Sequence, residues 1–226
     1  MRHYPRGTAA LLLVLASTAA CSAKKSLETA PRPAPTMHGD PAAIANAKPD
    51  SNRFPYTQAD VDFMSGMIGH HSQAIAMAKW APTRAASQSI RTLTARIINA
   101  QQDEITLMSQ WLRQHGQKVP EATSMGIKMN MGGMEHVMAM PGMLTEAQMK
   151  ELEASTGKKF DELFLTFMIQ HHKGALSMVK DLFGTPGAGQ DETTFKLAND
   201  INADQETEID RMQKMLIQLK FEGSLP

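Results

Sequence analysis

The sequence predicts an all-α protein with four long helices, and three observations support this fold class. A segment with helical periodicity occurs twice, at residues 63–79 and 164–180, and eight of its 17 positions are identical in the two copies. Each copy has apolar residues at the three- and four-residue spacing of an amphipathic helix. We predict no strands, because we find no segment with the alternating polar and apolar residues typical of a strand. We expect two helical hairpins joined by a connection that contains one short helix.

Capping signals place the helix ends. Thr57 and Asp60 have the spacing of a capping box, and Thr145 and Gln148 have the same spacing before the short helix. Gly116 is expected to end the second helix. The expected helices span about residues 57–80, 85–115, 145–157, 158–183 and 191–220.

The second helix of each expected hairpin is also repeated, at an offset of 104 residues. The matching residues are Gln101, Glu104, Ile105, Met108 and Leu112 in the first copy, and Gln205, Glu208, Ile209, Met212 and Leu216 in the second. The duplication therefore covers whole hairpins. We expect a domain over residues 55–222, with repeat 1 at about 57–116, a connection at about 120–145 and repeat 2 at about 158–220.

The N-terminal residues have the pattern of an export signal. Residues 1–20 contain two arginines, a short apolar run at 9–16 and then small residues, which predicts a signal peptide. Cys21 follows directly, as in a bacterial lipobox, so we expect it to be lipidated; ordinary cleavage nearby is the alternative, because Thr18 stands where lipoboxes usually carry Leu. Residues 22–54 are rich in Pro and Ala and are expected to form a flexible linker.

Composition excludes several classes of protein. The chain has 23 basic and 23 acidic residues, which argues against a strongly basic nucleic-acid binder. Its single cysteine excludes a disulfide or a cysteine-based zinc site within one chain. No nucleophile elbow, phosphate loop or dinucleotide fingerprint is present in the sequence.

Histidines and methionines share the apolar face of each repeated helix. The candidate metal ligands are Met67, His70, His71 and Met77, and then Met168, His171, His172 and Met178. A buried imidazole needs a partner, and the simplest alternative is a hydrogen bond to Glu104 or Gln101. We favour metal binding because an adjacent histidine pair, with Met at the i−3 or i−4 position, recurs in both halves. Spacing alone does not decide which histidine of each pair binds.

Carboxylates and further methionines lie near the same faces. These candidate ligands or supporting residues are Asp60, Glu104, Met108, Asp161, Glu208 and Met212. Thioether and imidazole donors together favour copper, and thioethers especially favour Cu(I). Zinc and iron are less favoured, because zinc rarely binds methionine and the Glu-x-x-His motif of di-iron bundles does not occur in the sequence.

The connection between the repeats is rich in methionine. Its candidate metal-capturing residues are Met125, Met129, Met131, Met134, His136, Met138, Met140 and Met143. Four glycines and Pro141 argue against a helix here. Closely spaced thioethers form a soft, flexible chelator for Cu(I). The alternatives are a cover packed over the helices, an interaction surface, or a methionine sink for oxidants.

These motifs resemble the DUF305 family. The resemblance lies in Asp-x-x-Phe-x-x-x-Met-Ile-x-His-His-x-x-Ala-x-x-Met, at residues 60–77 and 161–178, in Gln-x-x-Glu-Ile-x-x-Met, and in the methionine-rich connection. It implies a ferritin-like four-helix bundle exported by bacteria, and some members are associated with copper binding and copper tolerance. One departure is Met215, where the first copy has Trp111, so the two halves need not bind metal equally.

We therefore expect a non-catalytic protein of the periplasm or cell surface that takes part in copper homeostasis by sequestering copper or handing it on. Its expected partners are the metal ion and a copper donor or acceptor protein, with membrane contact only through a lipid on Cys21. One alternative is a bundle metalloenzyme, an oxidase or peroxide-handling protein. Another is a structural module whose histidines are core hydrogen-bonding groups and whose connection docks a partner.

Overall fold

The computed structural model describes residues 55–131 and 134–222. The predicted signal peptide, Cys21 and the linker at 22–54 lie outside these residues and stay predictions. Within the described part of the chain, no helix combines the length and the apolar character needed to cross a membrane.

The described chain is predominantly helical, as predicted. The helices are α2 (Gln58–Ala78), α3 (Ala81–Arg84), α4 (Gln88–Gln114), α5 (Glu146–Ala154), α6 (Gly157–Gly184) and α7 (Glu192–Glu222). Four of them, α2, α4, α6 and α7, are long and correspond to the expected pairs of the two repeats. The short helix of the connection, α5, is also present.

Both predicted capping boxes are confirmed. At the start of α2, Asp60 N donates to the Thr57 side chain while Asp60 accepts from Thr57 N, and Thr145 and Gln148 make the same pair of bonds before α5. Gly116 follows α4 with a φ of 67°, as a terminating glycine should. The helix boundaries differ from the expected ones by a few residues, mainly because the single turn α3 separates α2 from α4.

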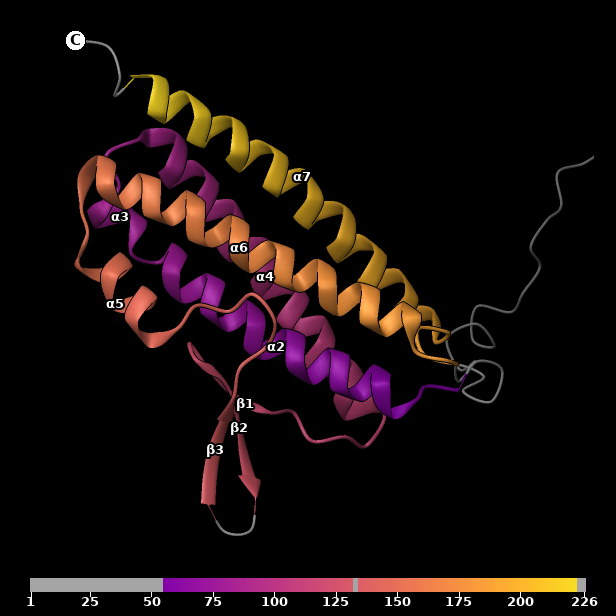
Figure 1. Ribbon diagram of the computed structural model, residues 1–226. Helices are drawn as coiled ribbons and strands as arrows, with labels where there is room; N and C mark the ends of the chain where they lie inside the picture. Colours follow the sequence, from indigo (N-terminus) through magenta and orange to yellow (C-terminus); the bar gives the residue numbers. More distant parts are fainter. Residues whose placement is uncertain (1–54, 132–133, 223–226) are drawn as a thin grey trace, which may run out of the picture. The chain divides into compact units, whose positions relative to one another are not determined.

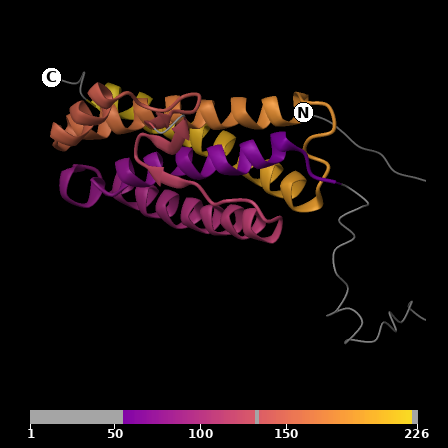
Figure 2. The same cartoon turned by 90° about the horizontal axis from the view of Figure 1, so that it is seen from below.

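The long helices pack as two hairpins. Helix α2 packs against α4, α6 packs against α7, and the two hairpins meet where α2 packs against α6 (Figure 1). From below, α2 lies between α4 and α6 (Figure 2). The α2–α6 contact is therefore the place where the two copies of the repeated motif face each other.

The core has two main apolar clusters, one on each side of the histidine positions. Along α2, one cluster ends at Ile68 and the other begins at Ala74. Along α6, the order is reversed, with boundaries at Ile169 and Ala175. The gap in each helix holds the histidine pair, so the four histidines form a polar layer between two apolar regions.

The connection contains a sheet, so the strictly all-α expectation is wrong there. Three antiparallel strands, β1 (Glu121–Thr123), β2 (Gly126–Met131) and β3 (Met134–Met138), pair in the order β1-β2-β3 and lie against α2. Residues 127–131 alternate apolar and polar side chains, and Gly132-Gly133 follows in the sequence, which together are the signal of a hairpin. Methionine is a weak strand former, which hid this alternation.

Candidate metal centre

His70 and His171 stack on each other at the centre of the α2–α6 contact. Their ring centroids are 3.7 Å apart, with a tilt of 35° between the planes. In α2 the ring centroids of His70 and His71 are 6.2 Å apart, and in α6 those of His171 and His172 are 6.3 Å apart. The angle between the ring planes is 56° in both pairs. The two repeats thus build the same histidine pair twice, and all four rings are fully buried.

The outer histidine of each pair is held by a glutamate of the partner helix. His71 Nε2 donates to Glu104 Oε2 at 2.6 Å, and His172 Nε2 donates to Glu208 Oε2 at 2.7 Å. These bonds join α2 to α4 and α6 to α7, so each lies within one repeat. Because Nε2 carries the hydrogen, the lone pair of the neutral ring is on Nδ1.

The connection holds the inner histidine of the first pair. His70 Nε2 lies 3.1 Å from the Pro141 carbonyl oxygen, which can only accept, so Nε2 carries the hydrogen here too. The segment is tied down by Gln73, whose amide nitrogen donates to the carbonyls of Ser124 and Leu144 and whose oxygen accepts from Leu144 N. The connection therefore runs across the middle of α2, a path that the sequence left open.

Glycine permits this crossing to come close to α6. A Cβ on Gly174 would lie 2.0 Å from the Pro141 carbonyl oxygen and 2.6 Å from Gly142 Cα. Gly142 itself has a φ of 77°, which favours glycine. The close approach places the Pro141 carbonyl beside the stacked histidines.

Among the described residues, the buried side-chain polar atoms that lack a hydrogen-bond partner are found in only six side chains. These atoms are Nδ1 of His70, His71 and His172, both ring nitrogens of His171, both amide atoms of Gln101, and Oε1 of Gln205. Native proteins pair nearly all buried polar groups, and each exception calls for a ligand, a water or a function. The concentration of all the exceptions in two motifs marks them as a candidate binding site.

The inner histidines are neutral at pH 7. Burial is the main cause that lowers the pKa of His70 and His171 well below its usual value, and the nearby histidines lower both further. The carbonyl of Pro141 raises the pKa of His70 by a smaller amount. A neutral imidazole keeps a lone pair that a metal can accept, so this environment suits ligation.

The helical methionines lie on both sides of the histidine layer. Met67 and Met108 are buried in one apolar cluster, and Met77, Met168 and Met212 are buried in the other. Met67 precedes His70 by three residues and Met168 precedes His171 by three, which puts each thioether on the same helix face as a histidine.

Met178 has a different environment from its repeat partner Met77. It is half-buried and packs against Ile127, Met140 and Met143 of the connection. Its methyl group lies 3.3 Å from the Cβ that Gly66 would carry. The two repeats are therefore not equivalent at this position.

Asp60 and Asp161 lie at helix ends, away from the histidines. Each precedes the inner histidine of its helix by ten residues, which is about 15 Å along the axis. Asp60 accepts from the backbone N–H groups of Thr57 and Gly189, and Asp161 accepts from Ala86 and Ser87. Burial raises the pKa of Asp161, and these amide bonds oppose that shift. Both carboxylates tie one repeat to a loop of the other.

The connection divides its methionines between the core and the surface. Met140 and Met143 are buried with Ile127, and Met125 is half-buried against the larger cluster. The strand register pairs Met129 with His136, Ile127 with Met138, and Met131 with Met134. Because strand residues two apart share a face, Met129, His136 and Met138 lie on the face of Ile127. Met129 and Met138 are 39% and 46% exposed.

The described residues contain no group of three or more His, Cys, Asp or Glu side chains arranged to hold a metal ion. Any preformed donor set at the histidine layer therefore has to combine imidazoles with thioethers or amide oxygens. Three further residues lie next to the histidines or to their glutamate partners, although their sequence positions were not predicted as site residues: Pro141, Gln101 and Gln205. The glutamines carried a detectable signal, because they are identical in both repeats and fall in the apolar sector.

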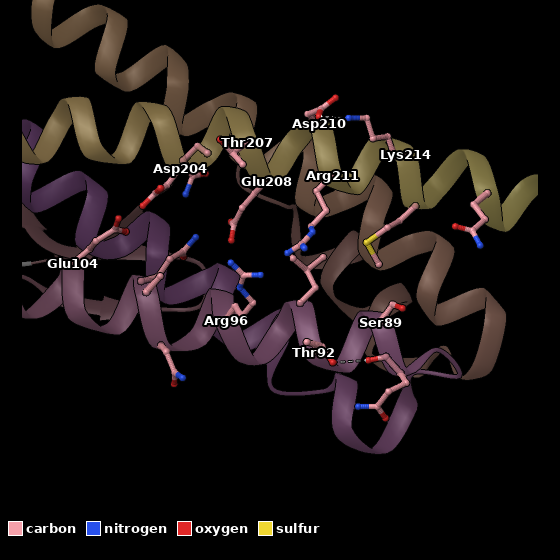
Figure 3. Close-up of a pocket in the computed structure, with 18 residues that line it drawn as sticks. Ser89, Thr92, Arg96, Glu104, Asp204, Thr207, Glu208, Asp210, Arg211 and Lys214 are labelled. Atoms are coloured by element: carbon pink, nitrogen blue, oxygen red, sulfur yellow. Dashed lines mark hydrogen bonds and ion pairs between the residues drawn. The ribbon is translucent and has the colours of Figure 1, made fainter.

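A cleft between α4 and α7 is lined by the two glutamates that bond the outer histidines. Its volume is about 1000 Å³ and its lining includes Gln101, Glu104, Gln205 and Glu208 (Figure 3). Burial, followed by the charges of Glu104 and Glu208, raises the pKa of Asp204 at the same place. The partners of His71 and His172 are thus accessible from the cleft.

Known proteins match this chain in sequence and in structure. The profile of the family described as "Domain of unknown function (DUF305)" matches residues 60–216. A segment of 56 residues is 45% identical to protein L153 of Acanthamoeba polyphaga mimivirus. That match spans 24% of this chain and only 37% of the viral protein.

Three solved structures share the fold. A DUF305 protein from Streptomyces coelicolor, classed as secreted, is 25% identical with a TM-score of 0.60 and covers 72% of this chain and 94% of its own. A DUF305 fragment from Deinococcus radiodurans is 26% identical with a TM-score of 0.60, covering 73% and 99%. The Cu(I)-bound form of CopM is 27% identical with a TM-score of 0.53, covering 70% and 96%; CopM structures with Cu(II) and with silver are similar.

Proposed function

Because the chain belongs to the DUF305 family, we propose that it is a non-catalytic copper-binding protein that works outside the cytoplasm. It sequesters copper or passes it to an acceptor protein. The histidine layer between the two repeats is the buried site, and the methionine face of the β2–β3 hairpin is the exposed one. In this proposal the four long helices form a ferritin-like bundle.

The observation that carries the proposal is the bonding of the buried histidines. Three of them donate Nε2–H, to Glu104, to Glu208 and to the Pro141 carbonyl, and leave Nδ1 without a partner. Histidines that bind metal typically donate their other N–H to a carboxylate or a backbone carbonyl, which fixes the ring and its tautomer. The residues present therefore fit a metal, which would supply the missing partner of the buried lone pairs.

The donor types favour copper among the metals. Imidazole and thioether donors occur together at two places in the described chain. Met67 and Met168 each precede an inner histidine by three residues, and Met129 pairs with His136 on the hairpin. Soft thioethers select Cu(I), and imidazole also suits Cu(II). CopM, a structural relative, has been solved with Cu(I), Cu(II) and silver, which supports this choice of metal.

The two sites suit different tasks. The hairpin presents Met129, His136 and Met138 to solvent and is suited to capture or exchange of Cu(I) with a donor or acceptor protein. The histidine layer is closed by the Pro141 crossing on the α2 side and is suited to retention. A protein with one exposed and one buried soft site can take up copper quickly and release it slowly.

An anaerobic Cu(I) titration against a competing chelator tests the proposal. The hairpin variant combines Met129→Leu, His136→Gln and Met138→Leu, and the layer variant is His171→Leu, which removes a ring that makes no hydrogen bond. Met149→Leu is the control, since Met149 is a buried methionine of α5 that is not among the candidate ligands. We expect each test variant to lose its own share of the bound copper and the control to lose none.

Other outcomes separate the alternatives. Wild-type binding too weak to compete, or binding unchanged in both variants, would contradict the proposal and leave the histidines as a hydrogen-bonded core. Turnover of dioxygen, peroxide or a cuprous salt by the loaded protein would instead favour a metalloenzyme. Iron and zinc titrations under the same conditions test the less favoured metals.

The proposed location rests on the N-terminal sequence. Residues 1–20 act as a signal peptide and a lipid on Cys21 tethers the domain through the linker at 22–54. Mass spectrometry of the protein purified from a bacterial host, compared with Cys21→Ala, tests this directly. A mature chain that begins at another residue without a lipid would contradict the tether while leaving export intact.

A further inference from the structure

The cleft between α4 and α7 has a floor made by repeat-related polar residues. Gln101 and Glu104 come from α4, and Gln205 and Glu208 come from the matching positions of α7. The duplication therefore puts two amides and two carboxylates, at equivalent positions of the repeats, in the lining of one cleft. The cleft itself is open to solvent along the two helices (Figure 3).

The two amides are buried and lack partners. Gln101 is 2% exposed and neither of its amide atoms is hydrogen-bonded. Gln205 is 3% exposed and its oxygen is not hydrogen-bonded. A leucine or methionine at either position would avoid the cost of burying an unsatisfied amide. The retention of glutamine at both places is explained if each amide oxygen binds a ligand in the cleft.

Each of the two carboxylates has a second oxygen that can accept another interaction. Glu104 and Glu208 each use Oε2 to accept from a histidine, and their side chains are 12% and 22% exposed. A carboxylate has two oxygens and about four lone-pair positions, so a second interaction through Oε1 is available to each. Burial and then the charges of Glu104 and Glu208 raise the pKa of Asp204, so a third carboxyl group lies near both glutamates.

We propose that this floor binds a hard divalent cation of the Mn²⁺, Ca²⁺ or Mg²⁺ class, through Gln101, Glu104, Gln205 and Glu208. Carboxylate and amide oxygens are the ligands that such cations prefer. The set has two acidic residues and two amides, so half of its oxygen donors would come from glutamine. This site differs from the copper sites in its donors, which are all oxygen, although Glu104 and Glu208 also hold His71 and His172.

The basic residues of the cleft should weaken its affinity for a cation. Arg96 and Arg211 reach toward each other from α4 and α7 (Figure 3). Arg211 is three residues after Glu208 on the same helix face, so its charge opposes a cation on the floor. Lys214, also in the cleft, is paired with Asp210. We expect Arg211→Gln to tighten cation binding by several-fold.

Titration of the copper-free protein with Mn²⁺ alone, followed by the electron paramagnetic resonance signal of free Mn²⁺, tests the site. The test variants are Gln101→Leu/Gln205→Leu and Glu104→Gln/Glu208→Gln, and the control is Asp210→Asn, which removes a carboxylate of the same cleft outside the floor. We expect one Mn²⁺ per wild-type chain, at least tenfold weaker binding in both test variants and little change in the control.

The leucine variant distinguishes loss of binding from loss of folding. It replaces unpartnered amides with apolar groups of similar size, so its melting temperature without metal should equal or exceed that of the wild type. Three results would overturn the proposal: no Mn²⁺ binding by the wild type, binding unchanged in both test variants, or binding lost only when the histidines are replaced. The Cu(I) titration is separate, so either proposal can fail without the other.

Discussion

The rings of His70 and His171, one from each repeat, stack with their centroids 3.7 Å apart, and both are fully buried. They are equivalent positions of a duplicated helix, yet only His70 is hydrogen-bonded, to the Pro141 carbonyl. The connection between the repeats passes the two rings only once, so its backbone accepts a hydrogen bond from only one of them. The pair is therefore symmetric in the helices and asymmetric in its bonds, and neither ring nitrogen of His171 has a hydrogen-bond partner.

Acid should destabilise the metal-free protein. Burial lowers the pKa of His70 and His171 in the folded state, so below about pH 6.5 the unfolded chain binds more protons than the folded one. The stabilisation present at pH 7.5 is then lost as the pH falls through this value. Urea unfolding at pH 7.5 and at pH 5.5 measures the loss.

Removal of one of these histidines should reduce that loss. His171→Leu deletes one of the two groups, so its free energy of unfolding should fall less between the two pH values than that of the wild type. Met149→Leu removes no titrating group and should match the wild type. Equal losses in His171→Leu and the wild type would show that other groups control the acid sensitivity.

The crossing of the connection depends on Gly174. Because a Cβ there would lie 2.0 Å from the Pro141 carbonyl oxygen, Gly174→Ala must displace the connection or α6. We expect a cost of about 1–3 kcal/mol in the free energy of unfolding, which is typical of overpacking. Gly184→Ala is the matched control, since no atom lies within 4 Å of its added Cβ. Chemical denaturation of both variants checks this, and equal stabilities would contradict the crossing.

We expect Asp60 to stabilise the fold, because its carboxylate accepts from the backbone N–H groups of Thr57 and Gly189. Asp60→Ala leaves the N–H groups of Thr57 and Gly189 without their acceptor, at a cost of about 2 kcal/mol in the free energy of unfolding. Its copper stoichiometry should equal that of the wild type. Asp62→Ala is the control, because the exposed Asp62 bonds only to Gln58. Loss of a bound copper ion in Asp60→Ala would place this carboxylate at the metal after all.

The contrast between Asp60 and the histidines shows what periodicity can and cannot predict. Helical spacing correctly indicated that Asp60, His70 and His71 share the buried side of α2, because the angle around a helix axis follows from residue number. The distance along the axis separates them by several turns. Proximity of Glu104 to His71 was among the alternatives, since partner helices of a hairpin pack closely.

The connection between the repeats shows which features the sequence could not predict. Its strands had a sequence signal in the alternation at residues 127–131, which the unusual use of methionine obscured. The bond from His70 to the Pro141 carbonyl had none, because it links residues 71 positions apart through a backbone atom. Such a contact depends on the tertiary path of the chain and on the missing side chain of Gly174.

Copper should stabilise the helical domain only through the histidine layer. A ligand that binds the folded state alone adds about 2.7 kcal/mol of stability at a free concentration of 100 times its Kd. If His70 and His171 both held a copper ion, the metal would link α2 to α6, so under this proposal anaerobic Cu(I) should raise the melting temperature of the wild type by several degrees. His171→Leu should lose most of this rise.

The hairpin variant should keep the rise in melting temperature although it binds less copper. The side chains of Met129, His136 and Met138 are exposed on the hairpin, so copper bound by them should be only weakly coupled to unfolding of the helical core. Calorimetry at matched free Cu(I) distinguishes the two sites. A rise that disappears in the hairpin variant and persists in His171→Leu would reverse the assignment, with the hairpin as the copper site that stabilises the fold.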